Sequence, residues 1–331
     1  MTMKELEHRL EKKASETAFS GVISVFKDDS TVFNKAFGYR DIKNKLPNTT
    51  ATRFGIASGT KIFTALGIGV LVDQGLISLG TTVGEIDQAY TGFIDERATI
   101  AHLLTHTSGI YDYYDEEIEQ DFEHFSVEIP WYELETPSEY YPLFKNQPMK
   151  FSPGERFSYS NGGYVFLGMI IEKLTGMLYR DFIHKHVLKA AGMHHSGFYA
   201  FNDLPENTAC GYFEDRRRTN IYQLPLRGGG DGGMYTTTDD LRSFWSSLFS
   251  NQILSAELTQ TYLNTHYAFN EADGYGCGIY KRLDDSVFGI SGGDAGVGFD
   301  SRHRVQEKVT VNILSNVTEG ADGLCAILDL L

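Results

Sequence analysis

Ala57-Ser58-Gly59-Thr60-Lys61 opens the longest apolar run of the chain, which continues over residues 62–72 and stops before Gly75. Apolar side chains cover nearly every face of a helix drawn through residues 58–74, and a glycine follows its end, which predicts a fully buried helix. The run is about half as long as the roughly 20 residues that a bilayer span needs. We therefore expect this helix in the core of the protein and expect no transmembrane segment.

The S-x-x-K spacing places Ser58 and Lys61 one turn apart on one face of this helix, so the lysine amine can reach the serine hydroxyl. A serine hydroxyl is a weak nucleophile at neutral pH, and a lysine whose pKa is lowered by burial can act as its base. The N–H groups at the start of the helix can also stabilise an oxyanion. Four-residue patterns recur by chance, so this motif alone does not establish catalysis.

Strand-forming runs lie on both sides of this helix in the sequence. Residues 19–27 and 31–37 predict a β-hairpin, and further strands are expected at residues 275–281, 286–289, 296–302 and 308–314. Helices are expected at residues 1–13, 99–105, 161–175, 180–188, 241–249 and 321–330.

Because both ends of the chain supply strands, the simplest architecture is an α/β (α+β) fold. It has one antiparallel sheet built from both termini and flanked by helices, with an all-helical domain inserted. We place the sheet domain at residues 1–85 plus 230–331 and the mostly helical inserted domain at residues 86–229. The active site is expected at their interface.

Two other segments carry groups that suit a substrate cleft. Tyr159 and Asn161 lie one residue apart just before a predicted helix, and extended residues with this spacing point the same way. Residues 289–298 are rich in glycine, so a substrate can approach the backbone there as an added strand. The alternative for this second segment is an ordinary glycine-rich turn.

Taken together and in this order, five motifs make the chain resemble the serine β-lactamase and penicillin-binding-protein-like family, over about residues 19–317. The resemblance is to its class C β-lactamase, D-aminopeptidase and β-lactamase-like esterase branch, and it implies a β-lactamase/transpeptidase-like fold. The motifs are Phe54-Gly-Ile-Ala-Ser-Gly-Thr-Lys61, His102-Leu-Leu-Thr-His-Thr-Ser-Gly109, Phe157-Ser-Tyr-Ser-Asn161, Gly232-Gly-Met-Tyr-Thr236 through Leu241, and Ser291-Gly-Gly293.

The resemblance implies a role for each matching residue. Ser58 would be the acylated nucleophile, Lys61 its proton acceptor or relay, and Tyr159 a second acid or base; which of the last two is the formal base stays open. Asn161 would bind both the substrate and Lys61. The substrate-binding strand would present Ser291, Gly292 and Gly293, and the oxyanion hole would use the backbone N–H groups of Ser58 and Gly293.

One position departs from the family pattern: Ile290 stands where the family usually has Lys or His. The change removes a partner for a substrate carboxylate and a charge that would help to lower the pKa of Lys61. It favours an esterase or a D-amino-acid peptidase over a true β-lactamase, acting on a small-molecule or peptide acyl substrate that does not depend on a carboxylate. Arg302 or Arg304 could replace the missing cation. The alternative function is a non-catalytic penicillin-binding-like or regulatory protein that has lost turnover.

Charge and composition exclude other classes of function. Among the 331 residues, 44 Asp and Glu outnumber 29 Lys and Arg, for a net charge of −15, which argues against nucleic acid as a partner. Residues 1–13 lack the apolar core of a signal peptide, so we expect a cytoplasmic protein without a membrane partner. The oligomeric state is not indicated.

No cofactor and no metal are expected. The 3 cysteines, Cys210, Cys277 and Cys325, form no C-x-x-C pair, and we expect buried thiols. His102 and His106 have the i, i+4 spacing of a metalloprotease pair, but no Glu follows His102, so structural roles are favoured. His194-His195 is interpreted as a surface turn.

Residues 111–125 hold 7 carboxylates and no Lys or Arg, with several aromatic residues nearby. One interpretation is an aromatic and acidic rim that selects amine-bearing substrates. The other, which we favour, is a solvated acidic loop that its aromatic residues anchor to the helical domain.

Overall fold

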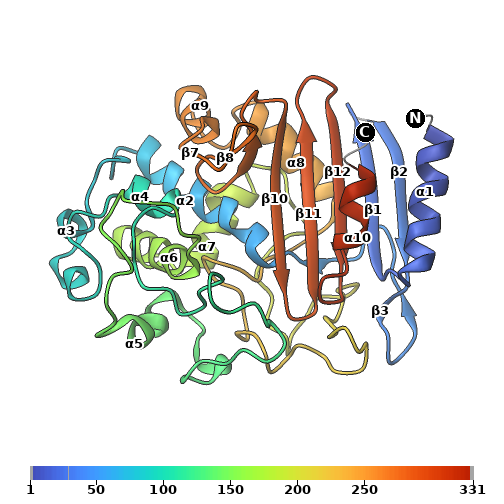
Figure 1. Cartoon of the computed structure of the whole chain (residues 1–331), viewed down its shortest axis with the longest axis horizontal. Helices are drawn as coiled ribbons and strands as arrows, with labels where there is room; N and C mark the ends of the chain where they lie inside the picture. Colours follow the sequence, from blue (N-terminus) through green and yellow to red (C-terminus); the bar gives the residue numbers. More distant parts are fainter. Residues whose placement is uncertain (1–2, 29, 329–331) are drawn as a thin grey trace.

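The computed structural model describes residues 3–28 and 30–328. Its centre is an antiparallel eight-stranded sheet in the order β2-β1-β12-β11-β10-β9-β8-β7, with helices on both faces (Figure 1). Strands from the two ends of the chain lie side by side, which confirms the predicted fold class. The strands are β1 (Gly21–Lys27), β2 (Ser30–Phe37), β7 (Tyr267–Ala268), β8 (Asp273–Tyr275), β9 (Tyr280–Arg282), β10 (Val287–Asp294), β11 (Val297–Arg304) and β12 (Val309–Ser315).

β1 is apolar at almost every position because both of its faces are buried. Successive side chains of a strand point to opposite faces of the sheet. Val22 joins the main core, whereas Ile23 and Val25 join a second core beneath α1 (Met3–Glu16) and α10 (Asp322–Leu328). Figure 1 shows these two helices on one side of the sheet and α8 (Thr238–Phe249) on the other.

A buried chain of polar side chains ties α8 to the centre of the sheet. Trp245 Nε1 donates to Ser301 Oγ (2.8 Å), which donates to Asn312 Oδ1 (2.6 Å), and Asn312 Nδ2 donates to Ser24 Oγ (2.9 Å). Each polar group of this network has a hydrogen-bond partner. The network therefore fixes the register of three strands without leaving an unpaired buried group.

The helical part of the molecule is organised around α2 (Lys61–Asp73), which packs against α6 (Asn161–Thr175). α6 has the predicted bounds because both of its ends are encoded locally. The hydroxyl of Ser160 accepts the N–H of Gly163 (2.9 Å) at its start, and Gly176 ends it with a left-handed φ of 68°. The remaining helices are α3 (Val83–Ile86), η2 (Gln88–Gly92), α4 (Ile100–Leu104), η3 (Trp131–Glu133), η4 (Pro137–Tyr140), α5 (Tyr141–Phe144), α7 (Tyr179–Ile183), η5 (His184–Leu188) and α9 (Ala256–Leu263).

The segment that carries Ser58 is anchored by a small two-stranded sheet. In it β5 (Phe54–Gly55) pairs with β6 (Tyr235–Thr236), directly before the turn η1 (Ala57–Thr60) that leads into α2. A further two-stranded sheet joins β3 (Tyr39–Asp41) to β4 (Leu46–Pro47).

Three sequence predictions need correction. The strand expected at residues 275–281 is instead the end of β8, a turn at Gly278 with φ of 76°, and the start of β9. β10 continues to Asp294, beyond the predicted end of that strand. Cys277 is buried, but Cys210 and Cys325 are partly exposed. The last residues of the helix predicted at 321–330 lie outside the described residues.

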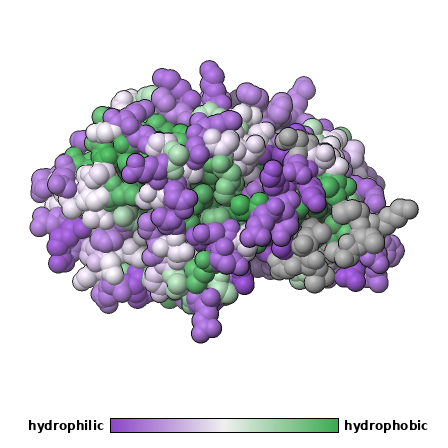
Figure 2. Space-filling view, turned by 90° about the horizontal axis from the view of Figure 1, so that it is seen from above, coloured by the Kyte–Doolittle hydropathy of each residue, from purple (hydrophilic) through white to green (hydrophobic). Residues whose placement is uncertain are grey.

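The described part of the chain contains no helix with the length and apolar character that a bilayer crossing requires. Figure 2 shows one face of the molecule, on which hydrophilic side chains predominate and apolar side chains form only small patches. The division into a sheet domain and an inserted domain stays a prediction.

Candidate active site

Ser58 lies in the tight turn η1 that leads into α2, half-buried at the edge of a cleft. Ala57, just before it, has a φ of 43°, which strains a residue that carries a Cβ atom. Thr60 holds the turn, because its hydroxyl donates to Ala57 O (2.7 Å) and accepts the N–H of Met234 (3.0 Å). The position of the Ser58 side chain is thus set by contacts on both sides of it.

Lys61 is buried, and three acceptors surround its amine. Nζ lies 3.0 Å from Ser58 Oγ, 2.7 Å from Asn161 Oδ1 and 2.8 Å from the carbonyl oxygen of Asp231. Burial lowers the pKa of Lys61, and the nearby carboxylates, Asp231 and Glu116 first, oppose this shift. The structure therefore brings the predicted lysine and serine into direct contact, and burial lowers the pKa of this lysine.

The ring of Tyr159 lies next to the same amine, with Lys61 Nζ 4.8 Å from the ring centroid. Burial raises the pKa of Tyr159 well above its usual value, and a hydrogen bond with Ser58 only partly opposes the rise. The phenol accordingly keeps its proton at neutral pH and contacts the candidate nucleophile.

Asn161 is held on every side at the first turn of α6. Its Nδ2 donates to Tyr114 O (2.9 Å) and to Glu116 Oε1 (3.3 Å), so its Oδ1 must face Lys61. Its backbone N–H donates to Asp112 Oδ2 (2.7 Å). Burial raises the pKa of Asp112 to about 7, against the lowering effect of the hydrogen bonds that it accepts from the backbone.

β10 passes directly over η1 and brings the predicted substrate-binding strand to Ser58. A Cβ atom on Gly292 would lie 2.2 Å from Ile56 O, so only glycine permits this approach. Gly293 lines the cleft together with Ser58, and Ser291, two residues earlier on the same face of the strand, is exposed. The proposed use of the Ser58 and Gly293 N–H groups as an oxyanion hole stays a prediction.

Ile290 is only 3% exposed and packs in the main apolar core. Arg302 lies opposite Gly289 and Arg304 opposite Val287, so both arginines share the sheet face that Ile290 does not use. Two cavities reach Ser58 and are described below. Neither Arg302 nor Arg304 lines them. Neither arginine therefore takes the place of the Ile290 side chain, and the hypothesis that one of them replaces the missing cation stays a prediction.

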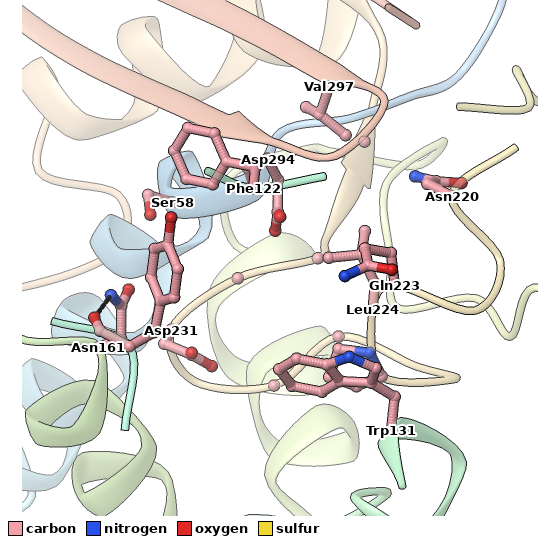
Figure 3. Close-up of a pocket in the computed structure, with 18 of the residues that line it drawn as sticks. Ser58, Phe122, Trp131, Asn161, Asn220, Gln223, Leu224, Asp231, Asp294 and Val297 are labelled. Carbon is pink, nitrogen blue, oxygen red and sulfur yellow. Dashed lines mark hydrogen bonds between the residues drawn. The ribbon is translucent and has the colours of Figure 1, made fainter. Parts of the chain in front are cut away.

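The cleft beside Ser58 has a cavity volume of about 90 Å³ and is partly open to solvent. Figure 3 shows residues that line it. Its walls are mainly aromatic, and the described lining residues include three carboxylates but no Lys or Arg. The aromatic residues are Tyr113, Tyr114, Phe122, Phe125, Trp131, Tyr140, Tyr199, Phe201 and Tyr235, and the carboxylates are Glu116, Asp231 and Asp294.

A second cavity of about 280 Å³ also reaches Ser58 and includes Tyr159, Ser291 and Gly293. Phe122 lines both cavities, and a Cβ atom on Gly293 would lie 3.5 Å from its ring. Figure 3 shows this ring next to Ser58 at the edge of the cleft. The side chain of Phe122 thus separates the two spaces in front of the candidate nucleophile.

The acidic segment 111–125 combines both of the interpretations weighed for it. Tyr113, Tyr114 and Glu116 line the cleft, whereas Asp115 pairs with Lys150 (2.6 Å) at the side. Several of its other carboxylates are exposed or cap local turns.

Sequence reasoning missed two residues of the cleft, Asp231 and Asp294. Asp231 lies within the glycine-rich run 228–233, and Asp294 directly follows Gly293 at the end of β10. Their glycine neighbours were the available signal, since glycines permit close backbone approach. Their meeting with Lys61 and Ser58 depends on contacts between distant parts of the chain.

His102 and His106 both accept hydrogen bonds from the backbone. His102 Nδ1 accepts the N–H of Thr99 (3.2 Å), and His106 Nδ1 accepts the N–H of Ser160 (3.0 Å). Within residues 3–28 and 30–328, no three His, Cys, Asp or Glu side chains converge closely enough to hold a metal ion.

Comparison with known proteins gives a consistent result. A family model described as "Beta-lactamase" matches residues 6–330. Penicillin-binding protein 4* of Bacillus subtilis is 29% identical over 98% of this chain and 74% of its own length. The chain spans 63% and 46% of the next two curated relatives.

Solved structures agree with this. The penicillin-binding protein of Bacillus halodurans superposes with a TM-score of 0.91 at 37% identity, covering 97% of this chain and 100% of that one. The D-amino acid amidase of Ochrobactrum anthropi superposes with a TM-score of 0.77 at 22% identity, covering 98% of each chain, and this likeness shows the fold alone.

Proposed function

The chain belongs to the beta-lactamase family, and from this premise we propose that it is a serine hydrolase that forms an acyl-enzyme at Ser58 and hydrolyses an ester or an amide. One observation carries the proposal: the buried amine of Lys61 lies 3.0 Å from Ser58 Oγ. Because burial favours the neutral amine, Lys61 can accept the serine proton during attack.

In the proposed acylation, Ser58 Oγ bonds to the substrate carbonyl carbon while its proton passes to Lys61 Nζ. The carbonyl oxygen becomes an oxyanion, and each N–H donor aimed at it is commonly worth about 10² to 10³ in rate. The bond to the leaving group then breaks. The leaving oxygen or nitrogen takes the proton from Lys61 either directly or through Tyr159. In the second case the Tyr159 phenol gives its proton to the leaving group and receives one from Lys61.

In deacylation, water attacks the carbonyl carbon of the acyl-enzyme and gives its proton to Lys61. The bond between the carbonyl carbon and Ser58 Oγ then breaks, Ser58 Oγ takes the proton from Lys61, and the acid leaves. The raised pKa of Tyr159 supports Lys61 as the base and Tyr159 as a proton donor.

The lining of the cleft supports an ester or a D-amino-acid peptide over a β-lactam as the substrate. Penicillins carry a carboxylate, and no Lys or Arg among the described lining residues could pair with it. Ile290 occupies the position of the family cation and is buried in apolar surroundings. Cytoplasmic location stays a prediction.

The proposal is tested by intact-mass measurement after incubation with a panel of nitrophenyl esters, D-amino-acid amides and penicillins. We expect the wild type to gain the mass of an acyl group and Ser58→Ala to gain none. Ser250→Ala, which removes an exposed hydroxyl at the end of α8, serves as the matched control and should be acylated like the wild type. Equal acylation of Ser58→Ala would overturn the proposal.

Ile290 also motivates a second candidate, a binding or regulatory protein that is acylated or occupied without turnover. The two candidates differ in stoichiometry. A hydrolase releases many equivalents of product per Ser58, whereas a binding protein releases at most one. Multiple Ser58-dependent turnovers of any substrate in the panel would exclude the second candidate.

A further inference from the structure

We propose that the cleft beside Ser58 recognises an acyl donor whose far end carries an organic ammonium group, with the carboxylate of Asp294 as its counter-ion. This inference rests on the proposed hydrolase function and names the substrate class for that same site.

The charge around the cleft is one-sided. Its described lining contains Glu116, Asp231 and Asp294 and neither Lys nor Arg. Lys61 is outside the described lining, and its amine is engaged by Ser58, Asn161 and the carbonyl oxygen of Asp231. Such a cleft attracts cations and repels carboxylates.

Of the three cleft carboxylates, Asp294 has an oxygen that can still accept a hydrogen bond. Asp231 accepts a hydrogen bond from the hydroxyl of Tyr113, and Glu116 accepts one from Asn161. Asp294 Oδ1 accepts only the N–H of Ala295 (2.9 Å), and its other oxygen has no partner among the described residues. In Figure 3 the carboxylate of Asp294 points from the end of β10 into the cleft. The ring of Phe122 lies between this carboxylate and Ser58.

A second observation points to a missing ligand. The hydroxyl of Tyr114 is buried and lacks any hydrogen-bond partner in the part of the chain that the structure describes, although Tyr114 lines the cleft and is only 8% exposed. Buried polar atoms are nearly always paired, so an unpaired one beside a cavity indicates a group that the ligand supplies. An ammonium N–H can donate to this oxygen and to Asp294.

The walls of the cleft suit the same group. Tyr113, Trp131 and Tyr140 line it and contact each other, with ring centroids 6.5 Å apart for Tyr113 and Trp131 and 5.4 Å apart for Tyr113 and Tyr140. Aromatic faces attract organic cations, most strongly where water is excluded. Since no three acidic, His or Cys side chains of the described residues converge on a metal position, we assign the cation to the substrate.

The test uses a matched pair of nitrophenyl esters. One has an acyl chain that ends in a primary ammonium group, and the other is the neutral isostere in which methyl replaces that group. For the wild type we expect kcat/KM to be at least about tenfold higher for the cationic ester, a difference of about 1.4 kcal/mol. A third ester that ends in a carboxylate should be the slowest.

Asp294→Asn keeps the shape of the side chain and should reduce the preference to about twofold or less, mainly by slowing the cationic ester. Glu128→Gln removes one charge from an exposed position near the same acidic segment, outside the cleft lining, and should keep the wild-type preference. Circular dichroism establishes that each variant is folded.

Equal kcat/KM for the cationic and neutral esters in the wild type would overturn the inference, whether or not Asp294→Asn folds. So would an equal effect of Asp294→Asn on both esters. These outcomes differ from failure of the proposed function, in which neither ester is hydrolysed in a Ser58-dependent manner.

Discussion

The rings of His106 and Tyr159 lie against each other, with centroids 4.4 Å apart and an interplanar angle of 31°. His106 is itself fixed, since Nδ1 accepts the N–H of Ser160 (3.0 Å) and Nε2 lies 3.1 Å from the hydroxyl of Tyr275. An N–H group can only donate, so Nδ1 carries no proton and Nε2 donates to Tyr275. His106 thus acts as a positioning residue for Tyr159.

His106→Phe keeps an aromatic ring but leaves the N–H of Ser160 without its acceptor. We expect the free energy of unfolding to fall by about 1–3 kcal/mol and kcat to fall with little change in KM. Urea unfolding and steady-state kinetics measure the two effects. Unchanged kcat would show that the ring contact does not position Tyr159.

The same variant changes the pH dependence of stability. Burial lowers the pKa of His106 well below its usual value, so below about pH 6.5 the unfolded chain binds a proton that the folded chain does not. The free energy of unfolding of the wild type therefore decreases as pH falls through this range. His106→Phe should show a smaller decrease, and an identical slope would contradict the assignment.

Asn161→Asp places a carboxylate at the position that now lies 2.7 Å from Lys61 Nζ. An adjacent opposite charge stabilises the protonated amine, so the pKa of Lys61 should rise by about 1–3 units. If neutral Lys61 is the base, the rising limb of the kcat/KM profile moves to higher pH by the same amount. Asn146→Asp, at an exposed turn, is the control and should leave the limb in place.

Phe122→Ala should join the two cavities that meet at Ser58. Because the ring of Phe122 now stands between them, its removal makes room for bulkier acyl groups. We expect the ratio of kcat/KM for a naphthoyl ester to that for an acetyl ester to rise about tenfold. Tyr222→Ala removes a ring that is 85% exposed and outside the lining, so it should leave the ratio unchanged.

Ile290→His restores the residue type that the family uses at this position, at a cost in stability because Ile290 is 3% exposed in an apolar core. We expect the free energy of unfolding to fall by about 1–3 kcal/mol. In the folded fraction, acylation by penicillin should become faster. Unchanged acylation in a folded variant would mean that position 290 does not control recognition of the carboxylate.

The preference for a cationic ester should depend on pH. Burial raises the pKa of Asp294 to about 7; Asp231 and Glu116 add to the rise, and Lys61 opposes it. The carboxylate is therefore mostly protonated at about pH 6 and mostly ionised at about pH 8. The preference for the ammonium ester should increase over this interval in the wild type and stay flat in Asp294→Asn.

Elements whose ends are encoded locally could be predicted from sequence. Ser160 and Gly176 mark α6 by a hydroxyl cap and a left-handed glycine, and the structure keeps both bounds. The alternating and apolar runs of β1 and β12 likewise identify strands without reference to their partners. The contact of Lys61 with Ser58 follows from helix periodicity alone.

Features that depend on the meeting of distant segments could not be predicted. The carbonyl oxygen of Asp231 accepts from Lys61 across 170 positions of the chain, and no local pattern encodes that contact. The side of the sheet on which Arg302 lies depends on register, because a shift of one residue reverses the face. The turn at Gly278 was overlooked because the residues around it are typical of strands.

The pairing of β1 with β12 also bears on how the chain folds. Val22 lies opposite Leu314, and Ser315 Oγ donates to the carbonyl oxygen of Ser20, a residue 295 positions earlier. During synthesis the hairpin of β1 and β2 must therefore wait for residues 309–315 before its inner edge is covered. Contacts of such long range slow folding, so protection of the β1 amides from hydrogen exchange should be a late event in refolding.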